Sequence, residues 1–282
     1  MPSSLIIIPC YNEQERLQSE TFLEFTRQHP HIQMLFVNDG STDNTLTVLH
    51  GLAASAPQSI DVCDLPQNGG KAEAVRQGML AALTTSADTI GFLDADLATP
   101  LDAIPTFLDV LNRRPDIDIV LGSRLSLLGR RIQRQPKRRL LGRLFATVAS
   151  HVLWTPICDT QCGAKLFRNT PLLRDVLSQP FLARWIFDVE LLARMKQLRQ
   201  EQQLSPLNEV VFEQPLDVWR EVPGSKLKAT DFAKAPWELV QIYSRYLSPW
   251  AEASQLQSYP LPVMRPFEGT TETVRRPQRR AA

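Results

Sequence analysis

Two carboxylates, Asp94 and Asp96, directly follow the apolar run 90–93, and their spacing could serve metal chemistry. Two carboxylates this close at the end of a strand repel each other unless a cation lies beside them. Mg²⁺ or Mn²⁺, held by one or two carboxylates together with substrate phosphates, would supply that cation. The alternative is structural, because Asp96 or Thr99 could cap a helix that begins near Pro100.

Two further polar clusters could bind parts of a nucleotide. Residues 38–43 read Asn-Asp-Gly-Ser-Thr-Asp, and Asp39 there could accept hydrogen bonds from a nucleobase. A capped turn between a strand and a helix is the alternative explanation of this cluster. Residues 68–71 combine two glycines with Lys71, so backbone N–H groups and one positive charge could bind a diphosphate. Their spacing matches neither a P-loop nor a dinucleotide-binding glycine motif.

The elements that must position these clusters alternate along the chain. Short apolar runs typical of buried strands occur at 5–9, 34–37, 60–63 and 89–93, and segments with helical spacing at 13–28, 42–54 and 71–83. This rhythm predicts an α/β fold with a mostly parallel, doubly wound sheet and helices on both faces. Each polar cluster then lies at the carboxyl end of a strand, where ligands bind in such sheets. Further strands are expected at 117–122, 165–168 and 210–214, and a further helix at 188–198.

The charge is balanced overall but not along the chain. The 282 residues carry 31 Lys and Arg against 30 Asp and Glu, which excludes a uniformly basic nucleic-acid-binding protein, so no nucleic-acid partner is expected. Between Ile119 and Cys158, however, there are eight basic residues and no acidic one. A helix at 140–153 with an apolar face overlaps the end of this basic segment. It could lie in a lipid interface with its basic side toward anionic headgroups, or pack on the core behind a solvated basic loop.

The apolar runs are too short for a membrane span, and no signal peptide is evident. We therefore expect a cytoplasmic protein. If the helix at 140–153 lies in a lipid interface, the protein would be peripheral at the inner face of the membrane. The tail, 254–282, is rich in Pro, Gln, Thr and Arg, and its composition predicts disorder.

Four motifs, in this order and spacing, resemble glycosyltransferase family 2: residues 8–13, 37–43, 68–71 and 94–96. The resemblance implies a GT-A fold, a nucleotide-diphospho-sugar donor and a divalent metal. Segments 122–124, 159–163, 184–190 and 224–227 are similar to the dolichyl-phosphate glucosyltransferase branch, with polyprenyl-phosphate mannosyltransferases as relatives. The resemblance covers about residues 4–230. It implies one GT-A domain at 1–253, with a donor half at about 1–122 and an acceptor half at about 123–253.

The resemblance also implies roles for individual residues. Asp94 would lie near the ribose or the metal, and Asp96 would bind the metal. Ala98 stands where the mannosyl-phosphate relatives often carry a Gln that also reaches the metal. The nucleoside pocket would be lined by Pro9, Tyr11, Glu13 and Asp39, with Lys71 nearby.

Direct displacement at the anomeric carbon would invert its configuration. Which protein groups must assist the reaction depends on the acceptor. A polyprenyl phosphate is largely ionised near neutral pH and needs cations to hold it; the candidates are Arg124, Lys226 and one of Arg131, Arg138 and Arg139. A hydroxyl acceptor, on a glycan or small polyol, needs a general base. Asp188 would then be that base, unless it caps the helix that follows. The remaining alternative is a non-catalytic module that binds a nucleotide or lipid. By resemblance alone, UDP-glucose is the favoured donor.

Overall fold

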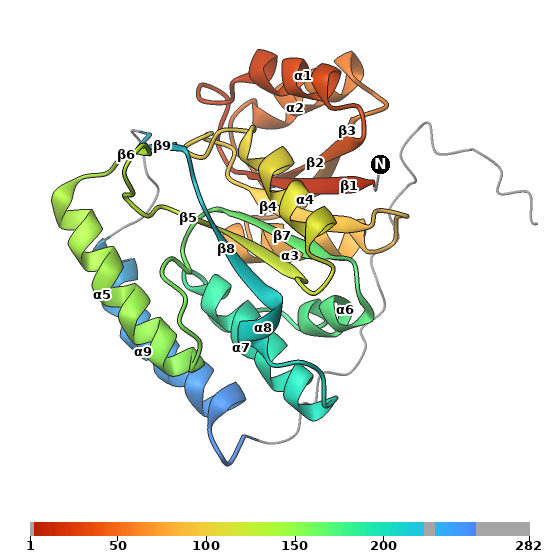
Figure 1. Cartoon of the computed structure of the whole chain (residues 1–282). Helices are drawn as coiled ribbons and strands as arrows, with labels where there is room; N and C mark the ends of the chain where they lie inside the picture. Colours follow the sequence, from red (N-terminus) through yellow and green to blue (C-terminus); the bar gives the residue numbers. More distant parts are fainter. Residues whose placement is uncertain (1–2, 223–228, 252–282) are drawn as a thin grey trace, which may run out of the picture.

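The computed structural model describes residues 3–222 and 229–251. A seven-stranded sheet with the order β3-β2-β1-β4-β7-β5-β8 runs through the molecule (Figure 1). The strands are β1 (Ser4–Cys10), β2 (Ile32–Asp39), β3 (Ile60–Leu65), β4 (Thr89–Leu93), β5 (Ile119–Ser123), β7 (Ala164–Arg168) and β8 (Val211–Pro215). Neighbouring strands are parallel except where β7 pairs antiparallel with both β4 and β5. The predicted single, mostly parallel sheet is therefore confirmed.

Both faces of the sheet are covered, which explains why its strands are nearly continuous apolar runs. Successive side chains of a strand point to opposite faces. Leu5 and Ile7 of β1 accordingly belong to one apolar cluster, and Ile6 and Ile8 belong to the other. The first cluster is completed mainly by α3 (Lys71–Ala82), α6 (Pro171–Leu177) and α7 (Phe187–Glu201), and the second by α1 (Ser19–Gln28), α2 (Thr45–Ser55) and α4 (Ala103–Arg113).

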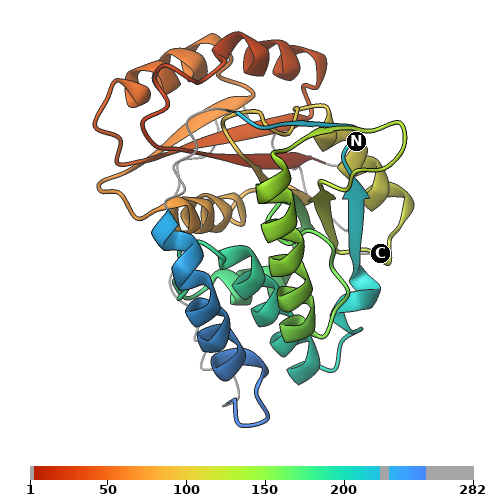
Figure 2. The same ribbon diagram turned by 90° about the vertical axis from the view of Figure 1, so that its left-hand side faces the viewer.

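Two long helices stand apart from these layers. Helices α5 (Pro136–Leu153) and α9 (Ala229–Ile242) extend away from the sheet on the same side of the molecule, and Figure 2 shows them next to each other. Helix α9 continues into the π-helical turn η1 (Tyr243–Leu247). A short parallel ribbon of β6 (Arg131–Gln133) and β9 (Val218–Arg220) lies before α5, and the small helix α8 (Leu207–Val210) leads into β8.

The helix predicted at 13–28 begins only at Ser19. Residues 13–17 form a turn instead, in which the N–H groups of Arg16 and Leu17 both donate to the carbonyl oxygen of Glu13 at 2.9 Å. The N–H of Glu13 donates to Oγ1 of Thr45 at 2.8 Å, which ties this turn to the start of α2. The turn thereby keeps Glu13 at the carboxyl end of β1.

Candidate active site

A cleft of about 1460 Å³ lies along the carboxyl ends of β1, β2 and β4 and continues between α5 and α9. It has a polar end, formed by side chains after the three strands, and an apolar end, formed by the two helices. Nine of the predicted site residues line it: Pro9, Tyr11, Glu13, Asp39, Lys71, Asp94, Asp96, Arg124 and Asp188. The fold thus brings residues up to 179 positions apart in the sequence into one cavity.

The two carboxylates after β4 each lie beside a cation of the protein. Nζ of Lys71 is 2.5 Å from Oδ1 of Asp94, and Nη2 of Arg16 is 3.6 Å from Oδ2 of Asp96. Burial raises the pKa of Asp96, and the neighbouring Asp94 carboxylate raises it further. Burial lowers the pKa of Lys71, but the Asp94 and Asp188 carboxylates outweigh it and the pKa is raised. The repulsion expected between the two aspartates is therefore present at this site.

The donor set at Asp94 and Asp96 fits a hard divalent cation, because both residues supply carboxylate oxygens. Within residues 3–222 and 229–251, no group of three or more His, Cys, Asp and Glu side chains is arranged to hold a metal. Ala98, which lines the same cleft, has no side-chain oxygen to add. A bound ion would therefore need the phosphate oxygens of a substrate to complete its coordination, as Mg²⁺ sites commonly do.

Gly163 makes room for the carboxylate of Asp94. A Cβ atom at position 163 would overlap that carboxylate. The backbone N–H of Asp94 also donates to the carbonyl oxygen of Gly163 at 3.0 Å. The segment before β7 is therefore part of the carboxylate site, although the sequence linked residues 159–163 only to the resemblance.

Asp39 uses its carboxylate to hold the glycine loop. Oδ1 accepts from the N–H of Gly69 at 2.8 Å, and Oδ2 accepts from the N–H of Gly70 at 2.9 Å and from Nδ2 of Asn68 at 3.0 Å. Burial raises the pKa of Asp39, against the opposing effect of the two backbone donors. The N–H groups expected to bind a diphosphate thus bind Asp39, and Gly70 takes the positive φ of 88° that starts α3.

Arg124 and Asp159 form a two-pronged ion pair at the cleft. Nε and Nη2 of Arg124 each lie 2.7 Å from one oxygen of Asp159, and the Arg124 N–H also donates to it at 3.0 Å. The guanidinium lies 5.4 Å from the centre of the Trp219 ring. Burial opposes the charge of Arg124, but Asp159 outweighs it and raises the Arg124 pKa above its usual range. The role of Arg124 in binding an acceptor stays a prediction.

Two of the remaining predicted acceptor cations, Arg131 and Arg139, lie away from the cleft. Both are exposed. The side chain of Arg138 is not among those described, and Lys226 and the tail 254–282 lie outside the described residues.

Two other arginines, Arg134 and Arg184, line the cleft instead. Arg134 belongs to the same basic segment as Arg131 and Arg139. It lines the cleft because it lies in the turn between β6 and α5. Its guanidinium packs so closely on Gly142 of α5 that a Cβ there would overlap it. Burial lowers the pKa of Arg134, and the nearby Arg124 guanidinium lowers it further.

Asp188 forms a buried ion pair with Lys165 of β7. The Lys165 ammonium lies 2.5 Å from Oδ1 of Asp188 and donates to the carbonyl oxygen of Cys162 at 2.6 Å. The side chains are 0% and 7% exposed, respectively. Asp188 lies inside the first turn of α7, whose N-cap position is Ile186 with no side-chain cap. The helix-cap interpretation of Asp188 is therefore wrong.

Comparison with known proteins agrees with the motifs. The family model described as Glycosyl transferase family 2 matches residues 5–174. A dolichyl-phosphate beta-glucosyltransferase of Drosophila melanogaster is 33% identical over 272 residues, which cover 88% of this chain and 77% of that protein. One from Trichomonas vaginalis is 33% identical over 248 residues, covering 84% and 69%. The chain belongs to glycosyltransferase family 2. It is thus a glycosyltransferase, and the alternative of a non-catalytic module is set aside.

Solved structures show the same fold. A glucosyl-3-phosphoglycerate synthase from Mycobacterium tuberculosis, in complex with Mn²⁺, UDP and glucosyl-3-phosphoglycerate, aligns with a TM-score of 0.60 and 19% identity, covering 86% of this chain and 80% of that one. The same enzyme in complex with UDP aligns with a TM-score of 0.58. The glycosyltransferase therefore has the GT-A fold that the motifs imply.

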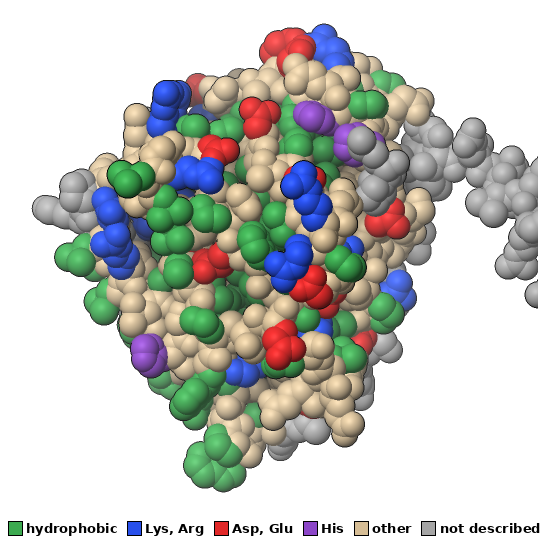
Figure 3. Space-filling model, viewed as in Figure 1, with side chains coloured by type: hydrophobic (Ala, Val, Ile, Leu, Met, Phe, Trp, Pro, Cys, Tyr) green, Lys and Arg blue, Asp and Glu red, His purple; other side chains and the backbone are tan. Residues whose placement is uncertain are grey.

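The apolar residues of α5, which forms one wall of the apolar end of the cleft, lie in two different environments. Ala149 and Leu153 are buried in the core, whereas Leu140, Leu144 and Val148, one turn apart from each other, are exposed by 70%, 63% and 43%. One row of this helix thus packs on the core, as the second sequence interpretation expects, and the other faces outward, where Leu144 and Val148 line the cleft. A role of this outward row in a lipid interface stays a prediction. Figure 3 shows hydrophobic side chains gathered on the side of the glycosyltransferase formed by α5.

Helix α9 supplies the opposite wall of the apolar end. Its lining residues are Ala235, Pro236, Leu239 and Val240, followed by Tyr243 of η1. Trp237 and Val240 are more than half exposed. Among the described helices, none is long and apolar enough to cross a membrane.

Proposed function

We propose that this glycosyltransferase moves glucose from UDP-glucose to a polyprenyl phosphate such as dolichyl phosphate, with inversion at the anomeric carbon. One observation carries the proposal: a single cleft joins a polar end built around two carboxylates to an apolar end between α5 and α9. A nucleotide-sugar suits the first and a prenyl chain suits the second. The names of the relatives, and the UDP and Mn²⁺ in the structural neighbour, support the choice.

The reaction requires stabilisation of the leaving group. As the bond from the anomeric carbon to the diphosphate breaks, negative charge develops on the diphosphate. When bound at Asp94 and Asp96, Mg²⁺ or Mn²⁺ supplies positive charge to that leaving group. Lys71, whose ammonium already lies 2.5 Å from Asp94, adds a fixed positive charge beside it. Asp39 holds the 68–70 loop in place and so keeps the start of α3, and with it Lys71, in position.

The acceptor phosphate would be bound by Arg134. Among the described residues, three of the five cations that line the cleft have carboxylate partners, whereas Arg134 and Arg184 have none within 4.0 Å. Arg134 stands at the start of α5, beside the apolar end. A phosphate placed there would let its prenyl chain run between α5 and α9.

The buried Lys165–Asp188 pair favours a phosphate over a hydroxyl acceptor. A general base must take up a proton, and protonated Asp188 would leave the buried Lys165 ammonium without its counter-charge. An ionised phosphate oxygen attacks without giving up a proton, so this difficulty does not arise.

The outward row of α5 and the basic residues near it suit a membrane surface. Leu140 would enter the interface, next to Leu144 and Val148 on the cleft, and the exposed Arg139 and Arg143 would meet anionic headgroups. We place the protein at the cytoplasmic face of a membrane as a peripheral protein. We keep the proposed division of the domain into a donor half at about 1–122 and an acceptor half at about 123–253.

The test is a transfer assay with labelled UDP-glucose or GDP-mannose, each with and without dolichyl phosphate. We expect label in the organic phase only with UDP-glucose and dolichyl phosphate together. Label carried by GDP-mannose would change the donor, and label confined to the aqueous phase in every reaction would refute the lipid acceptor.

A further inference from the structure

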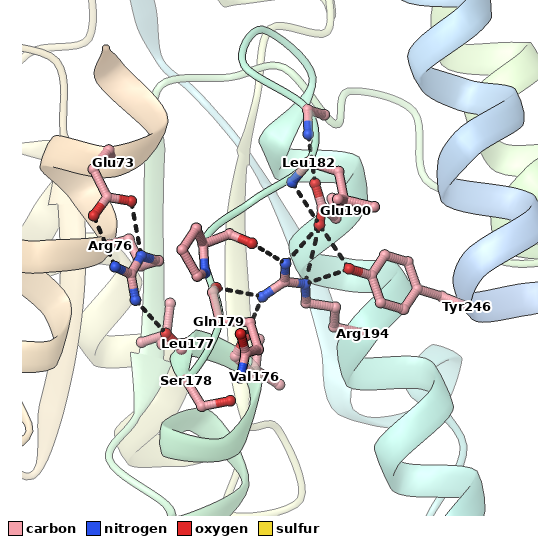
Figure 4. A network of polar contacts seen from close by, with 12 residues as sticks. Glu73, Arg76, Val176, Leu177, Ser178, Gln179, Leu182, Glu190, Arg194 and Tyr246 are labelled. Carbon is pink, nitrogen blue, oxygen red and sulfur yellow. Dashed lines mark hydrogen bonds and ion pairs between the residues drawn. The ribbon is translucent and has the colours of Figure 1, made fainter. Parts of the chain in front are cut away.

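A buried polar network joins α7 to the C-terminal turn η1 (Figure 4). Glu190 and Arg194 of α7 have fully buried side chains, and Nη2 of Arg194 lies 2.7 Å from Oε1 of Glu190. The Tyr246 hydroxyl of η1 donates to the same Oε1 at 2.9 Å and accepts from Nε of Arg194 at 3.1 Å. None of these three residues lines the cleft. Buried pairs of this kind are held in one geometry by their hydrogen bonds.

The network also hydrogen-bonds to the backbone of residues 176–183, which precede Arg184 on the cleft wall. Arg194 donates to the carbonyl oxygens of Val176, Gln179 and Pro180 at 3.0, 2.7 and 2.6 Å. Glu190 accepts from the backbone N–H groups of Leu182 at 3.1 Å and Ala183 at 2.8 Å. The backbone is therefore fixed up to the residue before Arg184.

The next residues are fixed from the other side. The Trp185 ring packs on Phe145 of α5, with ring centres 5.8 Å apart. The N–H of Ile186 donates to Glu238 of α9 at 3.4 Å. Segment 182–186 is thus held by α7, α5 and α9 together. Its charged member, Arg184, is left exposed on the cleft wall.

Arg184 and Asp39 line the same cleft. Burial raises the pKa of Asp39, and the Arg184 guanidinium is among the groups that lower it, so the two side chains are within electrostatic range. Together with Arg134, it is one of the two lining cations that have no carboxylate partner among the described residues. An anion bound in the cleft beside Arg184 would supply the missing partner.

We propose that Arg184 binds the diphosphate of the donor, and that Glu190, Arg194 and Tyr246 are positioning residues that hold it there. This inference rests on the nucleotide-sugar donor of the proposed function, but not on its acceptor. Because Tyr246 belongs to η1, the placement of Arg184 depends on the docking of the same C-terminal helix that walls the apolar end. Arg184 thereby links the two ends of the cleft.

The test is a double-mutant cycle read out by titration calorimetry with UDP, and with GDP in parallel. We expect Arg184→Ala to weaken nucleotide binding about tenfold through the loss of a charge-assisted contact. Tyr246→Phe, which removes one buried hydroxyl, should weaken binding by a smaller factor. In the double variant the Tyr246 effect should vanish, because the residue acts only through Arg184.

Arg199→Lys serves as the matched control. Arg199 is a second buried arginine of α7, but it binds Asp118 at 2.8 Å and the Ser205 carbonyl at 2.6 Å rather than the network. Its substitution should destabilise α7 without changing UDP affinity. Arg184→Lys should recover part of the affinity lost in Arg184→Ala.

Three results would overturn the inference: unchanged nucleotide affinity in Arg184→Ala, an undiminished Tyr246→Phe effect in the Arg184→Ala background, or no binding of UDP or GDP by the parent protein. If Tyr246→Phe does not fold, Glu190→Gln takes its place in the cycle. Intact nucleotide binding with no transfer to dolichyl phosphate would refute the proposed acceptor and leave this inference standing.

Discussion

The ammonium of Lys165 lies 2.5 Å from a carboxylate oxygen of Asp188, and neither side chain is more than 7% exposed. Lys165 comes from β7, the antiparallel strand in the middle of the sheet, and Asp188 comes from the first turn of α7. The pair therefore joins the central sheet to the first turn of α7, where Asp188 lines the cleft. The pairing also disfavours Asp188 as a general base, because neutralising its carboxylate would leave the buried Lys165 ammonium without a counter-charge.

Asp188→Asn should lower the free energy of unfolding by about 3–5 kcal/mol, the usual effect of breaking a buried ion pair. Lys165→Met should have a similar effect, and the double variant should lose less than the sum of the two. Denaturant unfolding of the three variants measures this coupling. Because no proton needs to be taken up, the pH profile of kcat in folded Asp188→Asn should keep its shape. Loss of one limb of that profile would identify Asp188 as a base.

Asp96→Asn should stabilise the protein in the absence of metal while abolishing transfer. The folded-state pKa of Asp96 is raised, so ionising it destabilises the fold as the pH rises through the unfolded-state pKa toward the folded one. The neutral amide removes this effect, and a rise in Tm of about 2 °C at pH 7 is the expected size.

At pH values below both of these pKa values, where Asp96 itself is protonated, the Tm difference between the two proteins should shrink. Added Mn²⁺ should raise the Tm of the parent protein but not of the variant. An equal response of both proteins to Mn²⁺ would exclude Asp96 as a ligand.

Gly163→Ala should leave the fold intact and lower kcat/KM by about 100-fold, the effect expected for a displacement near 1 Å in an active site. The added Cβ would overlap the Asp94 carboxylate and push it from its position beside Lys71. Gly51→Ala in α2 is the matched control, since a Cβ there meets nothing within 4 Å. The control should keep full activity; normal kcat/KM in both variants would show that Asp94 can move without consequence.

Reversing the charges of Arg139 and Arg143 should release the protein from vesicles of phosphatidylcholine and phosphatidylserine. Each basic residue near an anionic surface contributes about 1 kcal/mol, so the double reversal should weaken binding more than tenfold. The control reverses Arg27 and Arg113, which are exposed on α1 and α4 at the other face of the sheet. Equal loss in both double variants, or no vesicle binding by the parent, would refute an interfacial role for α5.

The polar end of the cleft could be predicted because its residues follow parallel strands in sequence. Once β1, β2 and β4 were assigned, the carboxyl ends carrying Glu13, Asp39 and Asp94 had to meet at one edge. The pairing of β7 could not be predicted in this way, because a short strand such as 164–168 carries no local signal for its neighbours or its direction. Gly163 and Lys165 lie in or next to that strand, so their roles became visible only in the fold.

Which cations would bind the acceptor also could not be predicted from the sequence. The basic segment 124–143 was evident from its charge, but which of its arginines faces the cleft depends on the turn between β6 and α5. That turn selects Arg134 and leaves Arg131 and Arg139 at the surface. Helix α9 was not predicted either, although its residues form half of the apolar end.

The most direct test of the central claim compares dolichyl phosphate with dolichol as acceptors for labelled UDP-glucose, at equal concentration in the same vesicles. The two lipids differ only in the phosphate, so the comparison isolates the group that Arg134 is proposed to bind. We predict label in the organic phase with dolichyl phosphate, none with dolichol, and a loss of transfer of about tenfold or more in Arg134→Ala. Equal labelling of both lipids, or labelling of dolichol alone, would contradict a phosphate acceptor.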